Sequence, residues 1–260
     1  MIFLKSKIKN LIYFFLNFVT GNLRNEASIL MYHSVSDTDF LFNVLPKDFT
    51  WQMKYLYDNN FNVISYAKLV ETLKNKEEIP HKAVVLTFDD GFSDNYDTVL
   101  PVLKKYNFPA TIFLTTNFVN NYFFIEKFNK KFKMLTWEQV EEMERSGLVD
   151  FQLHTTSHLK LSQINKNEIE KEITESKKII DEKLSKDSKL FAYPFGVYNE
   201  DVIEILKENN FDSAVTVMSG LVNKNSDLCV LPRNFVYLYC GRSEFKGLIK
   251  KTVSFFNFLK

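Results

Sequence analysis

Two adjacent carboxylates, Asp89 and Asp90, directly follow a run of apolar residues over positions 83–88, and Gly91 comes after them. An Asp-Gly pair is a common turn signal, so the chain could simply turn here. Two carboxylates held close together are costly, because their repulsion raises the pKa of one of them. A cation beside the pair would remove that cost.

Two of the four histidines, His154 and His158, follow a second predicted strand over positions 150–153 and are separated by three residues. This spacing could be incidental, but on a helix or in a turn it can also converge both rings on one ion. If both segments are strands of one parallel sheet, their carboxyl ends meet at the same edge. One carboxylate and two imidazoles would then suit Zn²⁺, Fe²⁺ or Co²⁺, with positions left open for water.

Three segments resemble, in order, the motifs of the polysaccharide deacetylases (carbohydrate esterase family 4, the NodB-homology domain). They are Thr87-Phe-Asp-Asp-Gly91, His154-Thr-Thr-Ser-His158 and Tyr193-Pro-Phe-Gly196. Leu30-Met-Tyr-His-Ser-Val35 is similar to the leader strand of the branch that acts on poly-N-acetylglucosamine and envelope glycans. The resemblance spans about residues 28 to 240. It implies a distorted (β/α) barrel with one metal ion and hydrolysis of an N-acetyl or O-acetyl group, N-acetyl being favoured.

The resemblance also implies a role for each motif residue. Asp90, His154 and His158 would hold one divalent metal ion, with Zn²⁺ favoured and Fe²⁺, Co²⁺ or Ni²⁺ as alternatives. Asp89 would be the general base that takes a proton from the attacking water, which a metal ion makes more acidic. The backbone N–H of Phe195 would help to stabilise the oxyanion that develops on the acetyl group.

Four further residues are expected to support the site or to contact the sugar. Thr155 would brace the histidine loop by hydrogen bonding. The other three are Tyr193, Pro194 and Tyr32.

The sequence departs from the family pattern in two places. Ala192 stands where many members carry an Arg that orients the base, and Arg233 is the expected replacement, the alternative being a surface or ion-paired arginine. No histidine follows His158, so the late histidine that supplies the family's general acid has no counterpart. By elimination the acid would be His33 or a water molecule, because His81 precedes a strand and would lie at the opposite end of the barrel. His33 could otherwise be structural.

Six short segments, most of them apolar, alternate with segments of helical periodicity and are predicted to be the strands that position these residues. These six segments cover positions 28–32, 83–88, 110–114, 150–153, 190–193 and 213–217. This alternation predicts an α/β fold with a parallel sheet and outer helices, and six units favour a barrel over an open sheet. Ser65 is expected to cap one helix, and Thr136 with Gln139 a second.

The composition is that of an ordinary globular protein: 33 Lys and Arg against 32 Asp and Glu, with 45% hydrophobic residues. A net charge of +1 argues against a general nucleic-acid binder, since neutralising phosphates needs a basic surplus. The expected partner is an acetylated glycan or a lipid-linked sugar.

Three parts are predicted: a basic apolar segment over 1–27, the deacetylase domain over 28–243 and a C-terminal amphipathic helix over 244–260. In the first part, three lysines precede an apolar run over 11–19 that is too short to span a bilayer. This segment could be a signal peptide, a helix on a membrane surface or a helix packed on its own domain. The favoured interpretation is an uncleaved, membrane-touching helix, and hence a membrane-associated or envelope location.

Two other functions stay open at this point. A glycosidase could use Asp89 and Asp90 as its carboxylate pair, but it needs carboxyl groups about 5 Å or more apart and leaves both histidines idle. A glycan-binding pseudoenzyme could share the barrel. The absence of the motif-three Arg and of a late His favours it, whereas the intact Asp and His pairs argue against it.

Overall fold

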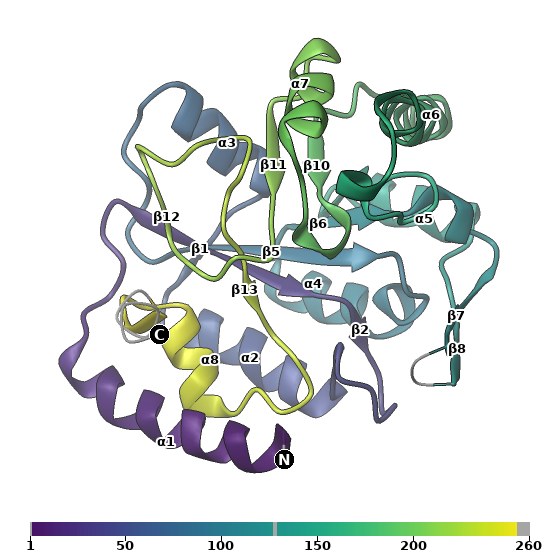
Figure 1. Ribbon diagram of the computed structural model, residues 1–260. Helices are drawn as coiled ribbons and strands as arrows, with labels where there is room; N and C mark the ends of the chain where they lie inside the picture. The colour runs from purple at the N-terminus through teal and green to yellow at the C-terminus, as the bar shows by residue number, and fades with distance from the viewer. Residues whose placement is uncertain (1, 127–128, 254–260) are drawn as a thin grey trace.

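The computed structural model describes residues 2–126 and 129–253 (Figure 1). Its centre is a curled sheet with the strand order β11-β10-β9-β6-β5-β1-β12, in which β13 also pairs with β1 and β4 with β5. These strands are β1 (Glu26–Tyr32), β4 (Asn62–Val63), β5 (Ala83–Asp90), β6 (Ala110–Leu114), β9 (Val149–Leu153), β10 (Leu190–Ala192), β11 (Ser213–Val215), β12 (Val222–Asn223) and β13 (Asn234–Phe235). Two small sheets join β2 (Ser34–Val35) to β3 (Asn43–Val44) and β7 (Tyr122–Ile125) to β8 (Lys130–Lys133).

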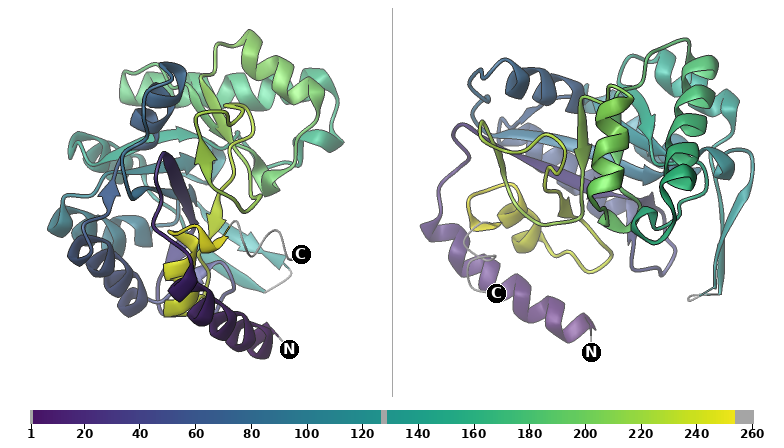
Figure 2. Two further views of the ribbon diagram at one scale, coloured as in Figure 1. Left: turned by 90° about the vertical axis from the view of Figure 1, so that its left-hand side faces the viewer. Right: turned by 45° about the horizontal axis from the view of Figure 1, so that its top comes forward.

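Helices surround this sheet, as the views from several sides show (Figure 1, Figure 2). They are α1 (Ile2–Val19), α2 (Pro46–Asp58), α3 (Tyr66–Lys74), α4 (Leu100–Tyr106), α5 (Trp137–Arg145), α6 (Lys166–Leu184), α7 (Glu200–Glu208) and α8 (Arg242–Leu248). Shorter helical turns are η1 (Asn95–Val99), η2 (Thr116–Phe118), η4 (Leu161–Gln163) and η5 (Pro194–Gly196).

The central strand β5 shows why the apolar runs become buried parallel strands. All eight of its residues are buried. Val84, Leu86 and Phe88 belong to one hydrophobic core, and Ala83 and Val85 belong to a second core on the other face. Because side chains alternate along a strand, the consecutive apolar residues 83–86 fill both faces, and the polar residues of β5 follow toward its carboxyl end.

The predicted helix starts are confirmed. The Ser65 side chain accepts a hydrogen bond from the backbone N–H of Lys68, and Thr136 and Gln139 form a reciprocal capping box. These contacts satisfy backbone donors that would otherwise have no partner in the first turn.

The predicted barrel is present in distorted form, and one late segment connects its two edges. Leu231 forms a parallel bridge with Val215 of β11, and Asn234 and Phe235 pair with β1 on the far side. Arg233 lies between these two pairings and is completely buried. The segment that closes the barrel therefore carries a guanidinium group into its interior.

Near the termini, α1 packs against α8. α8 ends at Leu248, whereas one helix was predicted over 244–260; residues 254–260, with Phe256 and Leu259, lie outside the described residues. The division of the chain into three parts stays a prediction. Within 2–126 and 129–253, no helix combines the length and the apolar character that crossing a membrane requires.

Candidate functional site

The polar residues singled out from the sequence meet in one cavity of about 650 Å³. It lies where β1, β5, β9 and β10 reach their carboxyl ends, the edge at which parallel α/β folds gather functional side chains. The predicted residues that line it are His33, Asp89, Asp90, His154, His158, Tyr193 and Phe195.

At the base of the cavity, Asp90, His154 and His158 form a compact cluster whose candidate ligand atoms all lie within 4.8 Å of one another. The Nε2 atoms of His154 and His158 are 3.6 and 3.4 Å from Oδ1 of Asp90. These separations leave the three donors facing one another without good hydrogen bonds, and Oδ1 of Asp90 is buried with no hydrogen-bond partner in the described part of the chain.

Burial shapes the electrostatics of this cluster. It raises the pKa of Asp90 to about 6, and it lowers the pKa of His154 to about 3 and of His158 to about 4. Both imidazoles are therefore neutral near pH 7 and can donate a lone pair. An unpaired buried carboxylate beside two neutral imidazoles fits a divalent cation, the group that would satisfy all three donors.

Neighbouring groups hold the two imidazoles in place. Nδ1 of His154 lies 2.7 Å from the carbonyl oxygen of Ala192, which directs Nε2 toward Asp90. The backbone N–H of His158 donates to Oγ1 of Thr155, the contact that was predicted for this threonine. The carboxylate of Glu172 on α6 accepts from two further amides of the same loop, those of Thr156 and Ser157. Such outer contacts fix the direction in which a ligating ring points.

Backbone conformations that non-glycine residues rarely adopt are concentrated here. Asp90, Thr155, His158 and Phe195 have φ values of 73°, 65°, 57° and 58°. Each costs free energy and persists only where the surroundings impose it, which is typical of functional sites. Gly91 also has a positive φ, and a Cβ there would lie 2.4 Å from Leu114 Cδ1, so only glycine fits after the two carboxylates.

Asp89 is bound by Arg233 through two hydrogen bonds of 2.6 and 2.7 Å. The guanidinium also donates to Thr87 Oγ1 and to the carbonyl of Thr216, so Arg233 is fixed on all sides. Burial is the largest single effect and would raise the pKa of Asp89, but the charge and hydrogen bonds of Arg233, together with His154 and His33, outweigh it and lower the pKa to about 2. Asp89 is thus a permanently ionised carboxylate in a fixed orientation.

His33 follows β1 and lines the cavity between the rings of Phe42 and Phe235, at centroid distances of 5.1 and 5.8 Å. Burial lowers the pKa of its imidazole. Its Nδ1 has no hydrogen-bond partner among the residues that the structure describes. Asn95 in η1 donates to the carbonyl oxygen of His33 and so fixes its backbone. The imidazole of His33 therefore lies on the cavity wall, with its Nδ1 buried, near the charges of Asp89 and Asp90.

The remaining expected residues divide into two groups. Tyr193 lines the cavity and donates its hydroxyl to the carbonyl of Cys229, and the half-exposed Phe195 ring lies 4.6 Å from that of His158. Pro194 is buried in the turn between them. Tyr32 does not support the expectation of a sugar contact: it is fully buried against Phe88 on the other face of β1.

Sequence reasoning missed most of the cavity wall, which is aromatic and aliphatic. Its other lining residues include Phe40, Phe42, Phe123, Ile125 and Phe235. No local signal separates these from the rest of the 26 phenylalanines. Glu172 was missed for a similar reason, because acidic residues are common along α6.

Comparison with known proteins agrees with this geometry. The polysaccharide deacetylase family model matches residues 76–214, which include both carboxylates and both histidines of the cavity. The Bacillus subtilis protein YxkH, assigned to the polysaccharide deacetylases, is 32% identical over 208 residues, covering 80% of this chain and 70% of that protein. The poly-beta-1,6-N-acetyl-D-glucosamine N-deacetylase of Staphylococcus epidermidis is 28% identical over 251 residues, covering 88% of this chain and 83% of that enzyme.

Among solved structures, the Streptococcus pyogenes deacetylase PplD in complex with acetate aligns with a TM-score of 0.77 at 28% identity, covering 88% of this chain and 99% of that one. The resemblance first suggested by three short motifs thus extends through the whole barrel. The chain belongs to the polysaccharide deacetylase family, carbohydrate esterase family 4.

Proposed function

We propose that this protein is a metal-dependent N-deacetylase of a β-linked N-acetylglucosamine polymer. The observation that carries the proposal is the unpaired, buried Oδ1 of Asp90, which faces Nε2 of His154 and of His158. Asp90, His154 and His158 would hold one divalent ion. Their mixed oxygen and nitrogen donors suit Zn²⁺ and also Fe²⁺, Co²⁺ or Ni²⁺.

In this proposal Asp89 is the general base. Arg233 presents the carboxylate in one orientation and keeps it ionised, so that it can accept a proton from the attacking water. Because the pKa of Asp89 is low, its carboxylate is a weak base toward ordinary water. A bound metal ion would act as a Lewis acid that makes the water molecule more acidic and polarises the acetyl carbonyl.

Two other groups complete the reaction. The backbone N–H of Phe195 would donate to the oxygen of the acetyl carbonyl as negative charge develops on it. His33, as an imidazolium ion, would deliver a proton to the sugar nitrogen as its bond to the acetyl carbon breaks, and the proton that Asp89 has taken from the water would replace it on His33. Water and the acetamide would then become acetate and an ammonium group. The position of His33 on the cavity wall near Asp89 and Asp90, whose charges favour the protonated ring against the effect of burial, supports this role.

The substrate class is supported by the relatives and by the cavity wall. The relatives from Staphylococcus are named for poly-beta-1,6-N-acetyl-D-glucosamine. Exposed aromatic faces such as that of Phe195 can pack against the apolar face of a sugar ring. Because such a substrate is a polymer, we place the site of action at the cell envelope.

The proposal is tested by measuring acetate release from β-1,6-linked N-acetylglucosamine oligomers by the purified chain, after treatment with a chelator and after return of Zn²⁺ or Co²⁺. We expect activity to disappear with the chelator, to return with the metal, and to stay absent in Asp90→Asn. Chelator-resistant release of shortened sugars would instead favour a glycosidase. Oligomer binding without acetate release under every metal condition would favour a pseudoenzyme.

A further inference from the structure

The polar and apolar faces of helix α1 are reversed relative to those of an ordinary surface helix. The face that packs on the protein is largely polar, whereas the face that points away from it is apolar. On the inner face, Asn10 accepts from the backbone N–H of Glu244, Asn17 donates to the carbonyl of Ser243, and Lys9 forms an ion pair with Glu244. A helix that packs on a soluble domain normally does the reverse.

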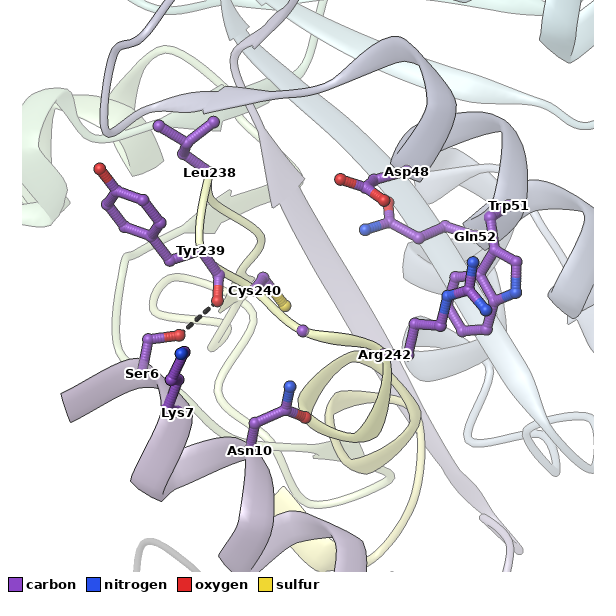
Figure 3. Close-up of a pocket in the computed structure, with 11 residues that line it drawn as sticks. Ser6, Lys7, Asn10, Asp48, Trp51, Gln52, Leu238, Tyr239, Cys240 and Arg242 are labelled. Atoms are coloured by element: carbon purple, nitrogen blue, oxygen red, sulfur yellow. Dashed lines mark hydrogen bonds between the residues drawn. The ribbon is translucent and has the colours of Figure 1, made fainter. Parts of the chain in front are cut away.

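The contact between α1 and the rest of the protein is specific. Ser6 donates its hydroxyl to the carbonyl of Tyr239, and these residues adjoin a polar cavity of about 290 Å³ (Figure 3). Tyr13, the one large side chain in the middle of this face, is 2% exposed and packs directly on Gly247 of α8. The helix is therefore held in one rotation about its axis, which fixes the direction of its outer face.

That outer face is a continuous apolar surface. Among the side chains of α1 that the structure describes, six large ones on this face are between 39% and 76% exposed: Ile8, Leu11, Ile12, Phe14, Phe15 and Phe18. At 3.6 residues per turn they occupy an arc of roughly 160°; Lys5 falls just beyond one margin, and Lys7 falls about 20° inside the other. α1 lies at the edge of the molecule, so this arc faces outward (Figure 1, Figure 2).

We propose that the outer face of α1 binds the surface of an anionic lipid bilayer, with the helix lying in the plane of the interface. The apolar arc would enter the boundary between headgroups and acyl chains, and the marginal lysines would extend to the phosphates. Charge favours this occupant over a second copy of the chain, because residues 1–25 contain four basic residues and no acidic one. Two such helices facing each other would repel.

This inference does not rest on the proposed deacetylase activity. It concerns a surface made by α1, and none of the residues assigned to the metal cluster or to proton transfer contributes to it. Because α1 is held by α8 and by the loop before it, docking the helix would hold the whole barrel at the membrane. A polymer or a lipid-linked sugar at the same surface would then meet an enzyme that is already concentrated there.

The test is flotation of the full chain with vesicles of phosphatidylglycerol and phosphatidylcholine in equal parts, and with phosphatidylcholine alone. We expect the chain to float with the anionic vesicles and to be released as salt rises. In Leu11→Ser/Phe15→Ser/Phe18→Ser the partition coefficient should fall by at least about tenfold. Lys5→Gln/Lys7→Gln should lower it roughly tenfold on anionic vesicles only. Tyr57→Ser removes an aromatic of similar exposure on α2 and should leave it unchanged.

Thermal melting and acetate release from a soluble oligomer accompany each variant, and Phe18→Ser alone serves as a milder change. Any of three results would overturn the inference. The first is a full chain that stays unbound to anionic vesicles at low salt, and the second is a triple variant that binds them as well as the parent. The third is light scattering that shows a dimer which the triple variant abolishes while vesicle binding is absent. Loss of turnover with intact flotation would count against the proposed function alone.

Discussion

Arg233 and Asp89, which are 144 residues apart in the chain, form a paired contact in which each nitrogen of the guanidinium fork donates to one carboxylate oxygen. Neither side chain reaches solvent to any useful extent. Arg233 is carried into this position by the segment that pairs with β11 on one side and with β1 on the other. Closure of the barrel and orientation of the proposed base therefore depend on the same few residues.

Replacing Arg233 with methionine should leave the Asp89 carboxylate buried without its partner. We expect the free energy of unfolding to fall by about 3–5 kcal/mol, because an uncompensated buried charge is far more costly than an intact pair. Asp89→Asn in the same chain should recover most of that loss, since the charge is removed with its partner. Acetate release should be lost in both variants. Urea unfolding and activity are measured on the single and double variants together.

Arg145→Met provides the control, because Arg145 pairs with Glu141 on an exposed helix face. Its effect on stability should stay within about 0.5 kcal/mol. If Arg233→Met were as stable as the parent, or if Asp89→Asn gave no recovery, the two side chains would not be coupled as the structure indicates.

Asp90→Asn should have opposite effects on stability with and without metal. Without metal, burial raises the pKa of Asp90 from 3.8 to about 6, so ionising this carboxyl group costs more free energy in the folded state than in the unfolded state. The variant should then be more stable than the parent by up to roughly 3 kcal/mol at pH 7.5 in a chelator. With Zn²⁺ at about a hundred times its dissociation constant, the parent should gain about 3 kcal/mol and the variant much less.

The sign of the pH dependence follows from the raised pKa of Asp90. The penalty for ionising this carboxylate is absent below about pH 4, grows as the pH rises to about 6 and is constant above that. The stability advantage of Asp90→Asn in chelator should follow the same course and vanish at pH 4. Equal stability of the two chains at pH 7.5, with and without zinc, would show that Asp90 is neither strained nor a ligand.

The sequence was sufficient to predict six strands of the central sheet, most of them short apolar runs that suit a sheet buried on both faces, but not the short strands β2, β3, β4, β7, β8, β12 and β13. It also placed Asp90, His154 and His158 at one edge, since parallel strands present their carboxyl ends together. Arg233 was expected to replace the missing arginine that orients the base, with a surface or ion-paired arginine as the alternative. No local pattern decides between the two, because the place of Arg233 follows from a barrel closure that only the tertiary structure reveals. The polar inner face of α1 was likewise hidden until α8 lay beside it.

His33→Gln should lower kcat by about a hundredfold or more, because a positioned proton donor contributes this much to the reaction. KM and zinc affinity should stay near those of the parent, since His33 is not one of the three clustered donors. His81→Gln, at the other end of the barrel, should leave turnover unchanged. Undiminished turnover in His33→Gln would assign the proton to water instead.

Thr155→Val tests whether the histidine loop is braced by the hydroxyl group. The variant keeps the shape of the side chain but removes the acceptor for the backbone N–H of His158. We expect zinc affinity to fall by about ten- to a hundredfold, as is typical when an outer contact of a ligand is lost. Competition with a chromogenic chelator measures it. Thr174→Val removes an exposed threonine hydroxyl on α6 and should not change the affinity. An unchanged affinity in Thr155→Val would mean that the loop is held by Glu172 alone.

Gly247→Ala tests the docking of α1 on α8. A Cβ at this position would lie 2.0 Å from Cδ1 of Tyr13, so the ring or the helix would have to move. Alanine in place of glycine normally stabilises a helix by up to about 1 kcal/mol, whereas overpacking should here destabilise the protein by about 1–3 kcal/mol. Gly21→Ala has no atom within 4 Å of its new methyl group and should be close to neutral. Urea unfolding shows whether Gly247→Ala stabilises or destabilises the protein. A stabilised Gly247→Ala would mean that Tyr13 does not rest on α8, and the outward direction of the apolar face of α1 would then lose its structural basis.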